Sequence, residues 1–275
     1  FILKTIVPNL NNNINTHSFI AAFEYPNNDG KIKNFLIKTH ALNTLNLDNG
    51  HWNSIRQGEL PYGNLIEHLC WHRDEKIGSN IDYNYFKRLM CIVKTNKDKN
   101  EFTIFIKQNS DIESKWIEYR PNGKDIIQNK MIHFIIYDLR NNLIGLNNIN
   151  HQIYKLNEQK CIWEGPINTD HNVKMKRLIF DWDRKMLGLD NNNIIWKKNS
   201  LDWVNSNWKT PTNSKINYID NIEQSITIFD LIHDTDGRLI GLSKEHGLVK
   251  QSNYNFNSHF VKYKDNVIDD TDKKD

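Results

Sequence analysis

The stretch Ile226–Gln251, ITIFDLIHDTDGRLIGLSKEHGLVKQ, predicts three short strands joined by two tight turns. Residues Ile226 to Asp234 are mainly β-branched and aromatic, a Thr-Asp-Gly turn signal follows, and Arg238 to Ser243 is apolar again. The segment Lys244 to Gly247 then turns into a third strand, Leu248 to Gln251. Because the same pattern recurs upstream, we predict a repeat protein.

Three copies of this repeat align on a glycine inside an apolar strand, with an aspartate seven positions earlier. The glycines are Gly145, Gly188 and Gly241, and the aspartates are Asp138, Asp181 and Asp234 (145−138, 188−181, 241−234). A strand that is apolar on both faces suits a position between two other sheets, where glycine usually marks the close approach of another backbone. We expect each aspartate to brace its turn by accepting hydrogen bonds from turn N–H groups, with ligand contact as the alternative.

The spacing of tryptophans sets the size of the repeat. Trp116, Trp163 and Trp208 lie 47 and 45 residues apart (163−116, 208−163), close to the length of a four-stranded propeller blade. We therefore predict an all-β protein, a single β-propeller of four-stranded antiparallel blades over residues 1–264. Five blades are expected, at about 17–56, 64–120, 131–166, 176–211 and 225–264, with six as the alternative.

The two ends of the chain are predicted separately. We expect residues 1–8 to form a strand that joins the outer edge of the last sheet and closes the ring, with a swinging N-terminal arm as the alternative. The polar residues 265–275 should form a disordered tail.

Two of the repeats also resemble a known family. FDWDRKMLGL (Phe180–Leu189) and HDTDGRLIGL (His233–Leu242) resemble the repeats of tachylectin-like five-bladed β-propeller lectins. The resemblance covers three of the five units, and only the last keeps the turn glycine, Gly237; Asn141 and Arg184 stand there in the other two. It implies binding of N-acetylated sugars between blades, without metal or catalysis, although no counterpart of the family's Gly-Gly-Trp segments is found.

Composition excludes several classes of function. Lys+Arg 36 against Asp+Glu 33 gives a net charge of +3 with both signs interspersed, so no nucleic-acid footprint is expected. No apolar run approaches the ~20 residues of a membrane helix. The 3 cysteines lie in apolar runs, which predicts buried free thiols. Asparagine is abundant, as expected of an AT-rich genome, yet no Asn-x-Ser/Thr acceptor occurs, which favours an intracellular location.

Large aromatic side chains are the first candidates for ligand contact, because sugar C–H faces stack on aromatic planes. The candidates are Trp52, Trp116, Trp163, Trp203 and Trp208. Packing in the wedges between blades is the alternative for the set. Since Trp203 and Trp208 lie among polar residues, we expect at least one of them to be exposed.

A metal site and a catalytic site are weaker candidates. His68, Cys70 and His72 alternate along one predicted strand and could together hold zinc. Alternatively, they fill a channel or pack between blades, since no Cys-x-x-Cys spacing is present. A glycosidase would need carboxylates converging from different blades. The repeated aspartates are equivalent positions, whereas catalytic groups in a ring of repeats should be singular.

We predict a monomeric, non-enzymatic binding module for a glycan or protein ligand, without cofactors. Its first expected function is lectin-like carbohydrate binding at sites between blades. The alternative is a protein–protein interaction scaffold, and the third possibility is a propeller-type glycosidase.

Overall fold

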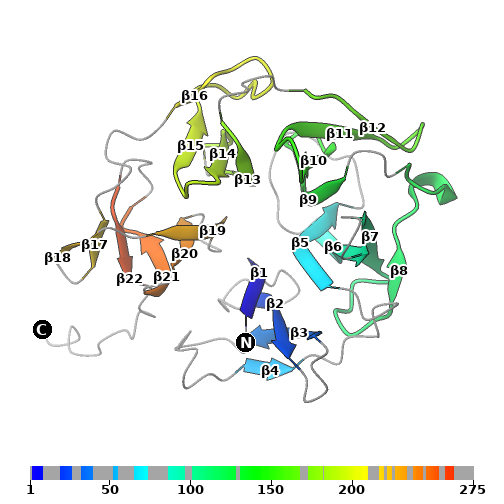
Figure 1. The fold of residues 1–275 in the computed structure, drawn as a ribbon, viewed down its shortest axis with the longest axis horizontal. Helices are drawn as coiled ribbons and strands as arrows, with labels where there is room; N and C mark the ends of the chain where they lie inside the picture. Colours follow the sequence, from blue (N-terminus) through cyan, green and yellow to red (C-terminus); the bar gives the residue numbers. More distant parts are fainter. Residues whose placement is uncertain are drawn as a thin grey trace, which may run out of the picture.

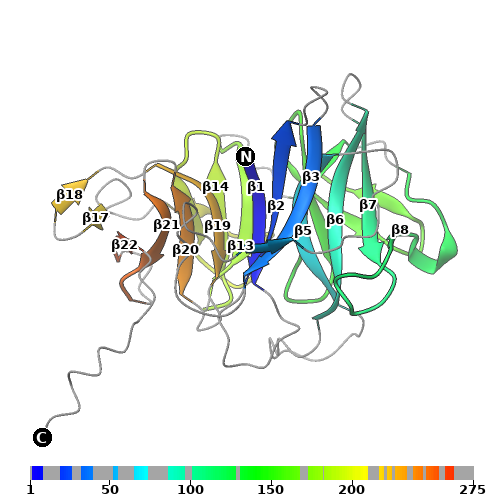
Figure 2. The ribbon, with the colours of Figure 1, turned by 90° about the horizontal axis from the view of Figure 1, so that it is seen from below.

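The computed structural model describes residues 2–8, 19–26, 32–39, 52–54, 65–73, 86–96, 101–127, 131–167, 173–181, 183–209, 217–219, 222–224, 227–233, 238–243, 246–253 and 258–262. These residues form five four-stranded sheets and one two-stranded sheet. The five larger sheets are arranged radially around a central axis (Figure 1), and their strands stand roughly along that axis in the side view (Figure 2). The predicted all-β propeller of four-stranded antiparallel blades is confirmed.

The blades are named A to E in chain order. Blade A contains β1 (Ile2–Pro8), β2 (Phe19–Pro26), β3 (Ile32–Thr39) and β4 (Trp52–Ser54). Blade B contains β5 (Leu65–Arg73), β6 (Phe86–Asn96), β7 (Glu101–Lys107) and β8 (Trp116–Glu118), followed by the short 3-10 helix η3 (Pro121–Gly123). Blade C contains β9 (Ile132–Tyr137), β10 (Leu143–Asn147), β11 (Ile153–Asn157) and β12 (Ile162–Glu164).

Blades D and E complete the ring. Blade D contains β13 (Met175–Phe180), β14 (Met186–Asp190), β15 (Ile195–Lys198) and β16 (Trp208–Lys209). The two-stranded sheet, β17 (Asn217–Ile219) and β18 (Ile222–Gln224), lies beside blade E. Blade E contains β19 (Ile228–His233), β20 (Leu239–Ser243), β21 (Gly247–Gln251) and β22 (Phe260–Lys262). The three strands predicted within Ile226–Gln251 are thus β19, β20 and β21.

The innermost strands close the ring around the axis. β1 lies next to β5 and β19, β5 next to β9, β9 next to β13, and β13 next to β19. β1 pairs with β2 and is the innermost strand of blade A. The prediction that residues 1–8 join the last sheet or form an arm is therefore wrong. β1 has its own sheet to pair with, and closure comes from packing between blades rather than from a shared sheet.

The repeated glycines allow side chains, not backbones, to approach the second strand of each blade. A Cβ on Gly145 would lie 2.5 Å from Cγ2 of Ile132 and 3.1 Å from the Trp163 ring. At Gly188 the corresponding side chains are Met175 and Trp208. The first residue of the inner strand and the tryptophan of the outer strand thus fold over the glycine. The expectation of a close backbone approach is wrong, because two large side chains of the same blade fill that space.

The hairpin turns explain how the repeat tolerates the loss of its turn glycine. Asn141 and Arg184 adopt left-handed backbone angles, with φ of 60° and 65°, at the position that Gly237 occupies in the last repeat. In the turn of blade C, Asp138 Oδ1 accepts hydrogen bonds from the N–H groups of Arg140 (2.9 Å) and Asn142 (2.7 Å). These bonds hold the turn without glycine.

Side chains between adjacent sheets form the core. Clusters of buried apolar residues lie around β1 and β5, between blades B and C, between blades C and D, and between blades D and E. All three cysteines are buried and free, as predicted. Within the described residues, no helix is long and apolar enough to cross a membrane.

Candidate functional site

Each innermost strand contains a β-bulge at the same level. The pairing register with the second strand shifts by one residue at this point in all five blades. The extra residues, called here the bulge positions, are Lys4, Glu67, His133, Lys176 and Phe229. The residues that follow them, called the axial ring, are Thr5, His68, Phe134, Arg177 and Asp230. A bulge re-aims the side chains beside it, and one residue of a different type from each blade meets at the axis.

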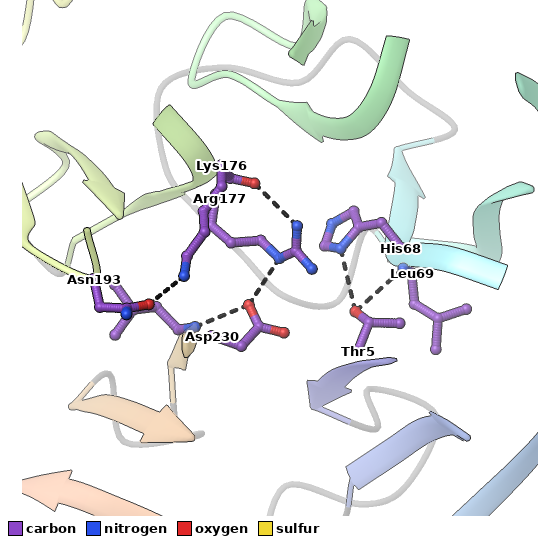
Figure 3. A network of polar contacts seen from close by, with 8 residues as sticks. Thr5, His68, Leu69, Lys176, Arg177, Asn193 and Asp230 are labelled. Carbon is purple, nitrogen blue, oxygen red and sulfur yellow. Dashed lines mark hydrogen bonds and ion pairs between the residues drawn. The ribbon is translucent and has the colours of Figure 1, made fainter. Parts of the chain in front are cut away.

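Contacts run through the axial ring from blade A to blade E. Thr5 Oγ1 lies 3.2 Å from His68 Nδ1, and the His68 ring stacks on Phe134 with centroids 3.9 Å apart. The guanidinium carbon of Arg177 lies 5.6 Å from the centre of the Phe134 ring, and Arg177 Nε donates to Asp230 Oδ1 at 3.1 Å. Figure 3 shows Arg177 and Asp230 reaching inward from β13 and β19 toward Thr5 and His68. The five blades are therefore linked by four consecutive contacts.

Arg177 and Asp230 are held in defined orientations. Arg177 Nη1 donates to the carbonyl oxygen of Lys176 at 3.0 Å, and the Leu231 N–H donates to Asp230 Oδ1 at 3.0 Å. The second oxygen, Asp230 Oδ2, is buried and has no hydrogen-bond partner among the described residues. In Figure 3 this oxygen points toward the middle of the ring, on the side of Thr5. The Arg177 side chain keeps 18% of its surface accessible.

Burial and neighbouring charge shift the pKa values of these groups. Desolvation raises the pKa of Asp230, and the nearby Arg177 guanidinium opposes that shift. Desolvation and the positive charge of Arg177 lower the pKa of His68 well below its usual range and that of His133 to about 4. Near neutral pH the two imidazoles are thus uncharged, and the Arg177–Asp230 pair is the charged part of the ring.

The four candidate tryptophans whose side chains the structure describes are not on the surface. Trp116, Trp163, Trp203 and Trp208 are all buried, with Trp203 and Trp208 only 7% and 8% exposed. The expectation that one of these two is exposed is wrong, because both pack in the core between blades C and D. Trp52 lies in β4, but its side chain falls outside the described residues.

Buried lysines, which were not expected from the sequence, cover Trp116 and Trp208. The Lys107 ammonium lies 4.2 Å from the Trp116 ring centre and donates to the Ser114 carbonyl at 2.7 Å. Lys198 repeats the arrangement over Trp208. In each blade the accepting serine stands two residues before the tryptophan, and this Ser-x-Trp pattern was the available signal.

The candidate metal ligands do not gather. His68 belongs to the axial ring, Cys70 is buried between blades B and C, and His72 Nδ1 is hydrogen-bonded to the Tyr137 hydroxyl. Within the described residues no group of three or more potential metal ligands forms. Desolvation also raises the pKa of the Cys70 thiol, which disfavours the thiolate that zinc requires. His68 lies at the axis, and Cys70 and His72 pack between blades B and C, as in the alternative prediction for these residues.

The repeated aspartates have separate surroundings. Asp138 braces its own turn, whereas Asp181 Oδ2 forms an ion pair with Lys197 and its Oδ1 lies 3.5 Å from His233 Nε2. Desolvation opposes the negative charge of Asp181, but hydrogen bonds and charge from His233 and Lys197 outweigh it and lower the pKa of the carboxyl. Asp234 lies outside the described residues.

Comparisons with known proteins found similarity only to solved structures. Neither a family model nor a curated protein matches the chain. It is similar to virginiamycin B lyase from Staphylococcus aureus, at 9% identity over 95% of this chain and 69% of the other, with a TM-score of 0.45. It is also similar to Ycf48 bound to a D1 peptide (9% identity, 94% of this chain, 66% of the other, TM-score 0.45). The WD40 propeller domain of Doa1 matches at 9% identity over 90% of this chain and 92% of the other, with a TM-score of 0.39.

The assignment as a β-propeller rests on the arrangement of the sheets in this chain, and a propeller fold by itself does not indicate a function. No tachylectin family is identified by these comparisons. The chain spans about two thirds of the lengths of the first two proteins (69% and 66%).

Proposed function

We propose that this propeller is a non-enzymatic binding module that holds a hydroxylated ligand, a saccharide, at the axial ring. Hydroxyl groups both donate and accept hydrogen bonds. Two neighbouring hydroxyls can therefore donate to Asp230 and accept from Arg177 at the same time. This proposal keeps the carbohydrate ligand expected from the sequence but moves it from the tryptophans to the axis.

One observation carries the proposal: Asp230 Oδ2 is buried without a partner beside a guanidinium held in place. A buried polar atom of this kind requires a hydrogen bond from another group, and it accepts strongly because it is charged. The contacts to Leu231 and Lys176 fix the pair before any ligand arrives. Such preorganisation lowers the ordering cost of binding.

The charge of the pair favours an uncharged group at the axis. An anion placed on Arg177 would also face the second oxygen of Asp230. At about 4 Å and an effective dielectric of about 20, two like charges repel by about 4 kcal/mol. A hydroxyl pair avoids this repulsion, as does an amide. The axial ring contains one carboxylate, whereas hydrolysis of a glycoside usually uses two, and this supports binding rather than catalysis.

The experiment is calorimetric titration of neutral and N-acetylated monosaccharides and of an uncharged N-acetylated amino-acid amide into the full chain at pH 7. We expect saturable binding to a sugar, weakened at least about tenfold in Asp230→Asn and in Arg177→Gln, as expected for loss of a hydrogen bond to a charged group. Asp138→Asn, which changes a buried carboxylate away from the axis, is the matched control and should bind like the parent chain.

Each outcome has a clear meaning. Well-folded protein that binds no sugar would overturn the proposal, as would sugar binding that survives both axial substitutions. Binding of the amide alone would retain the axial site but replace the ligand class. Thermal melting of every variant separates loss of binding from loss of folding.

A protein-interaction scaffold is the second candidate, favoured by two exposed apolar side chains at one end of the axis. Met131 and Ile149 are 37% and 64% exposed, and the Asn148 N–H donates to the Met131 carbonyl, so they lie on adjoining segments. Aromatic and apolar anchors of this type are common in protein interfaces. A Met131→Ser/Ile149→Ser variant should retain sugar binding if the saccharide proposal holds. Partner capture that depends on these residues, without sugar binding, would favour the scaffold.

A further inference from the structure

Basic side chains gather at the end of the axis where the innermost strands begin, over blades C and D. His133 and Lys176 occupy the bulge positions of β9 and β13, directly before Phe134 and Arg177. His151 belongs to the turn between β10 and β11, which lies at the same end because adjacent strands are antiparallel. Mutual electrostatic effects link His133 with His151 and with Arg177, so these groups are near neighbours.

Hydrogen bonds across the two blades fix this basic group. His151 Nε2 lies 3.2 Å from Asn191 Nδ2, and the Asn191 N–H donates to the Lys174 carbonyl at 3.0 Å. The Lys176 ammonium donates to the amide oxygen of Asn193. His133 Nδ1 and His151 Nδ1 are both buried without hydrogen-bond partners among the described residues. Each of these two imidazole nitrogens and the ammonium therefore has capacity for a further hydrogen bond.

The nearby carboxylates are engaged elsewhere. Asp190 Oδ1 accepts hydrogen bonds from the N–H groups of Asn192 and Ile194, and its Oδ2 accepts from Trp196 Nε1. Asp230 is paired with Arg177. Asp190 keeps its negative charge near Lys176, but Lys174, which acts on His151, adds a second ammonium, so the rim carries a small positive charge near neutral pH.

From this arrangement we infer that the ligand is an acidic saccharide whose carboxylate is bound by His133, His151 and Lys176, while its hydroxyls meet Arg177 and Asp230. This inference rests on the proposed function and specifies its ligand class. It divides recognition between two levels: an uncharged hydroxyl pair at the axis and an anionic substituent at the rim. Charge-assisted hydrogen bonds to a carboxylate are shorter and stronger than those to a neutral hydroxyl.

The inference predicts a dependence on pH. The titratable and charged groups that face His133 are His68 from β5, His151 from the β10–β11 turn and Arg177 from β13. Desolvation lowers the pKa values of His133 and His151, with Arg177 adding to the shift at His133 and Lys174 to the shift at His151. A bound carboxylate acts in the opposite direction, so binding takes up protons. Affinity for an acidic sugar should rise as the pH falls from 7.5 to 5.5.

The test compares pairs of sugars that differ in one group: glucose with glucuronic acid, and galactose with galacturonic acid. Affinities are measured at both pH values for the full chain and for a His133→Gln/Lys176→Gln variant, with Lys209→Gln as a control for removal of an exposed charge. We expect the acidic member of a pair to bind about tenfold more tightly at pH 5.5, as for gaining one charged hydrogen bond. The variant should lose that preference but still bind the neutral member.

The outcomes separate this inference from the proposed function. Equal binding of both members of each pair, or tighter binding of the neutral one, would overturn the acidic ligand and leave the axial site intact. No binding of any member would overturn both. A preference for the acid that persists in the His133→Gln/Lys176→Gln variant would place the carboxylate elsewhere and also contradict the inference. Single substitutions at His133 and Lys176 serve if the double variant melts below the assay temperature.

Discussion

The axial ring and the glycine–tryptophan layer further out are both built from equivalent positions of the blades, yet they use that equivalence in opposite ways. In the outer layer the residues repeat: Gly145 and Gly188 are each covered by a tryptophan and by the first residue of the inner strand. In the axial ring the positions repeat and the residues differ, from threonine through to aspartate. Repetition solves the same packing problem in each blade, whereas a single site on the axis requires five different groups.

Breaking the ring should have the largest effect. In Arg177→Met, Asp230 stays buried without its ion-pair partner, and we expect a loss of about 3–5 kcal/mol of unfolding free energy. The double variant Arg177→Met/Asp230→Leu removes the unpaired carboxylate and should recover most of the lost unfolding free energy. Denaturant unfolding of the parent chain and these two variants measures this. A double variant as unstable as the single one would show that the ring depends on shape rather than on charge pairing.

The outer layer can be tested with two matched glycine substitutions. In Gly145→Ala the new Cβ meets Cγ2 of Ile132, a branch close to the backbone that cannot move far; in Gly188→Ala it meets the flexible end of Met175. We expect a loss of about 2 kcal/mol for Gly145→Ala, as for overpacking. Gly188→Ala should cost less than half as much. Equal losses in thermal melts would mean that the tryptophans, which lie at similar distances in both blades, set the cost.

The sequence predicts the outer layer better than the axis for a physical reason. Glycine and aspartate recur because each blade needs them, so the fold and the hairpins can be found by alignment. The axial residues also stand at a constant distance before the glycines (145−134, 188−177 and 241−230 are all 11). Since Phe134, Arg177 and Asp230 share no chemistry, this column does not stand out. The position of a β-bulge, moreover, is not marked by any one residue type, so it cannot be predicted from the sequence.

For the tryptophans, the sequence predicts exposure where the structure shows burial. Polar neighbours around Trp203 and Trp208 indicate an exposed loop, but Lys198 turns its ammonium inward over the Trp208 ring and bonds a carbonyl. Long side chains with a polar end can cover an aromatic ring in this way. Local polarity is therefore a poor guide to exposure where a lysine can be satisfied by the backbone of its own blade.

The smallest expected effects concern the dependence of stability on pH, which should distinguish the rim from the outer layer. At the rim, His133 has its pKa lowered from 6.5 to about 4, so the unfolded chain binds more protons between these values. In the outer layer, desolvation lowers the pKa of Lys107 from 10.5 to about 8, with the same sign. His133 therefore contributes a rise in stability from about pH 4 to 6.5, and Lys107 contributes one from about pH 8 upward. Burial raises the pKa values of Asp230, Cys70 and Cys91, so Asp230 opposes the first rise and the two thiols oppose the second.

Single substitutions assign each window to its region. His133→Gln should reduce the acidic rise by about 1–3 kcal/mol, leaving the part due to His68, whose pKa is also lowered by burial. Lys107→Met should flatten the alkaline rise, by no more than about 1 kcal/mol, because the ammonium keeps its bond to the Ser114 carbonyl in the parent chain. The alkaline measurements should stop below pH 10, where Tyr119 and Tyr137, whose pKa values burial raises, begin to oppose the trend. His133→Gln should leave the alkaline part of the curve unchanged, and Lys107→Met should leave the acidic part unchanged. A change in the other window would show that the rim and the outer layer are coupled, which would contradict the separation of repeated packing positions from singular axial positions.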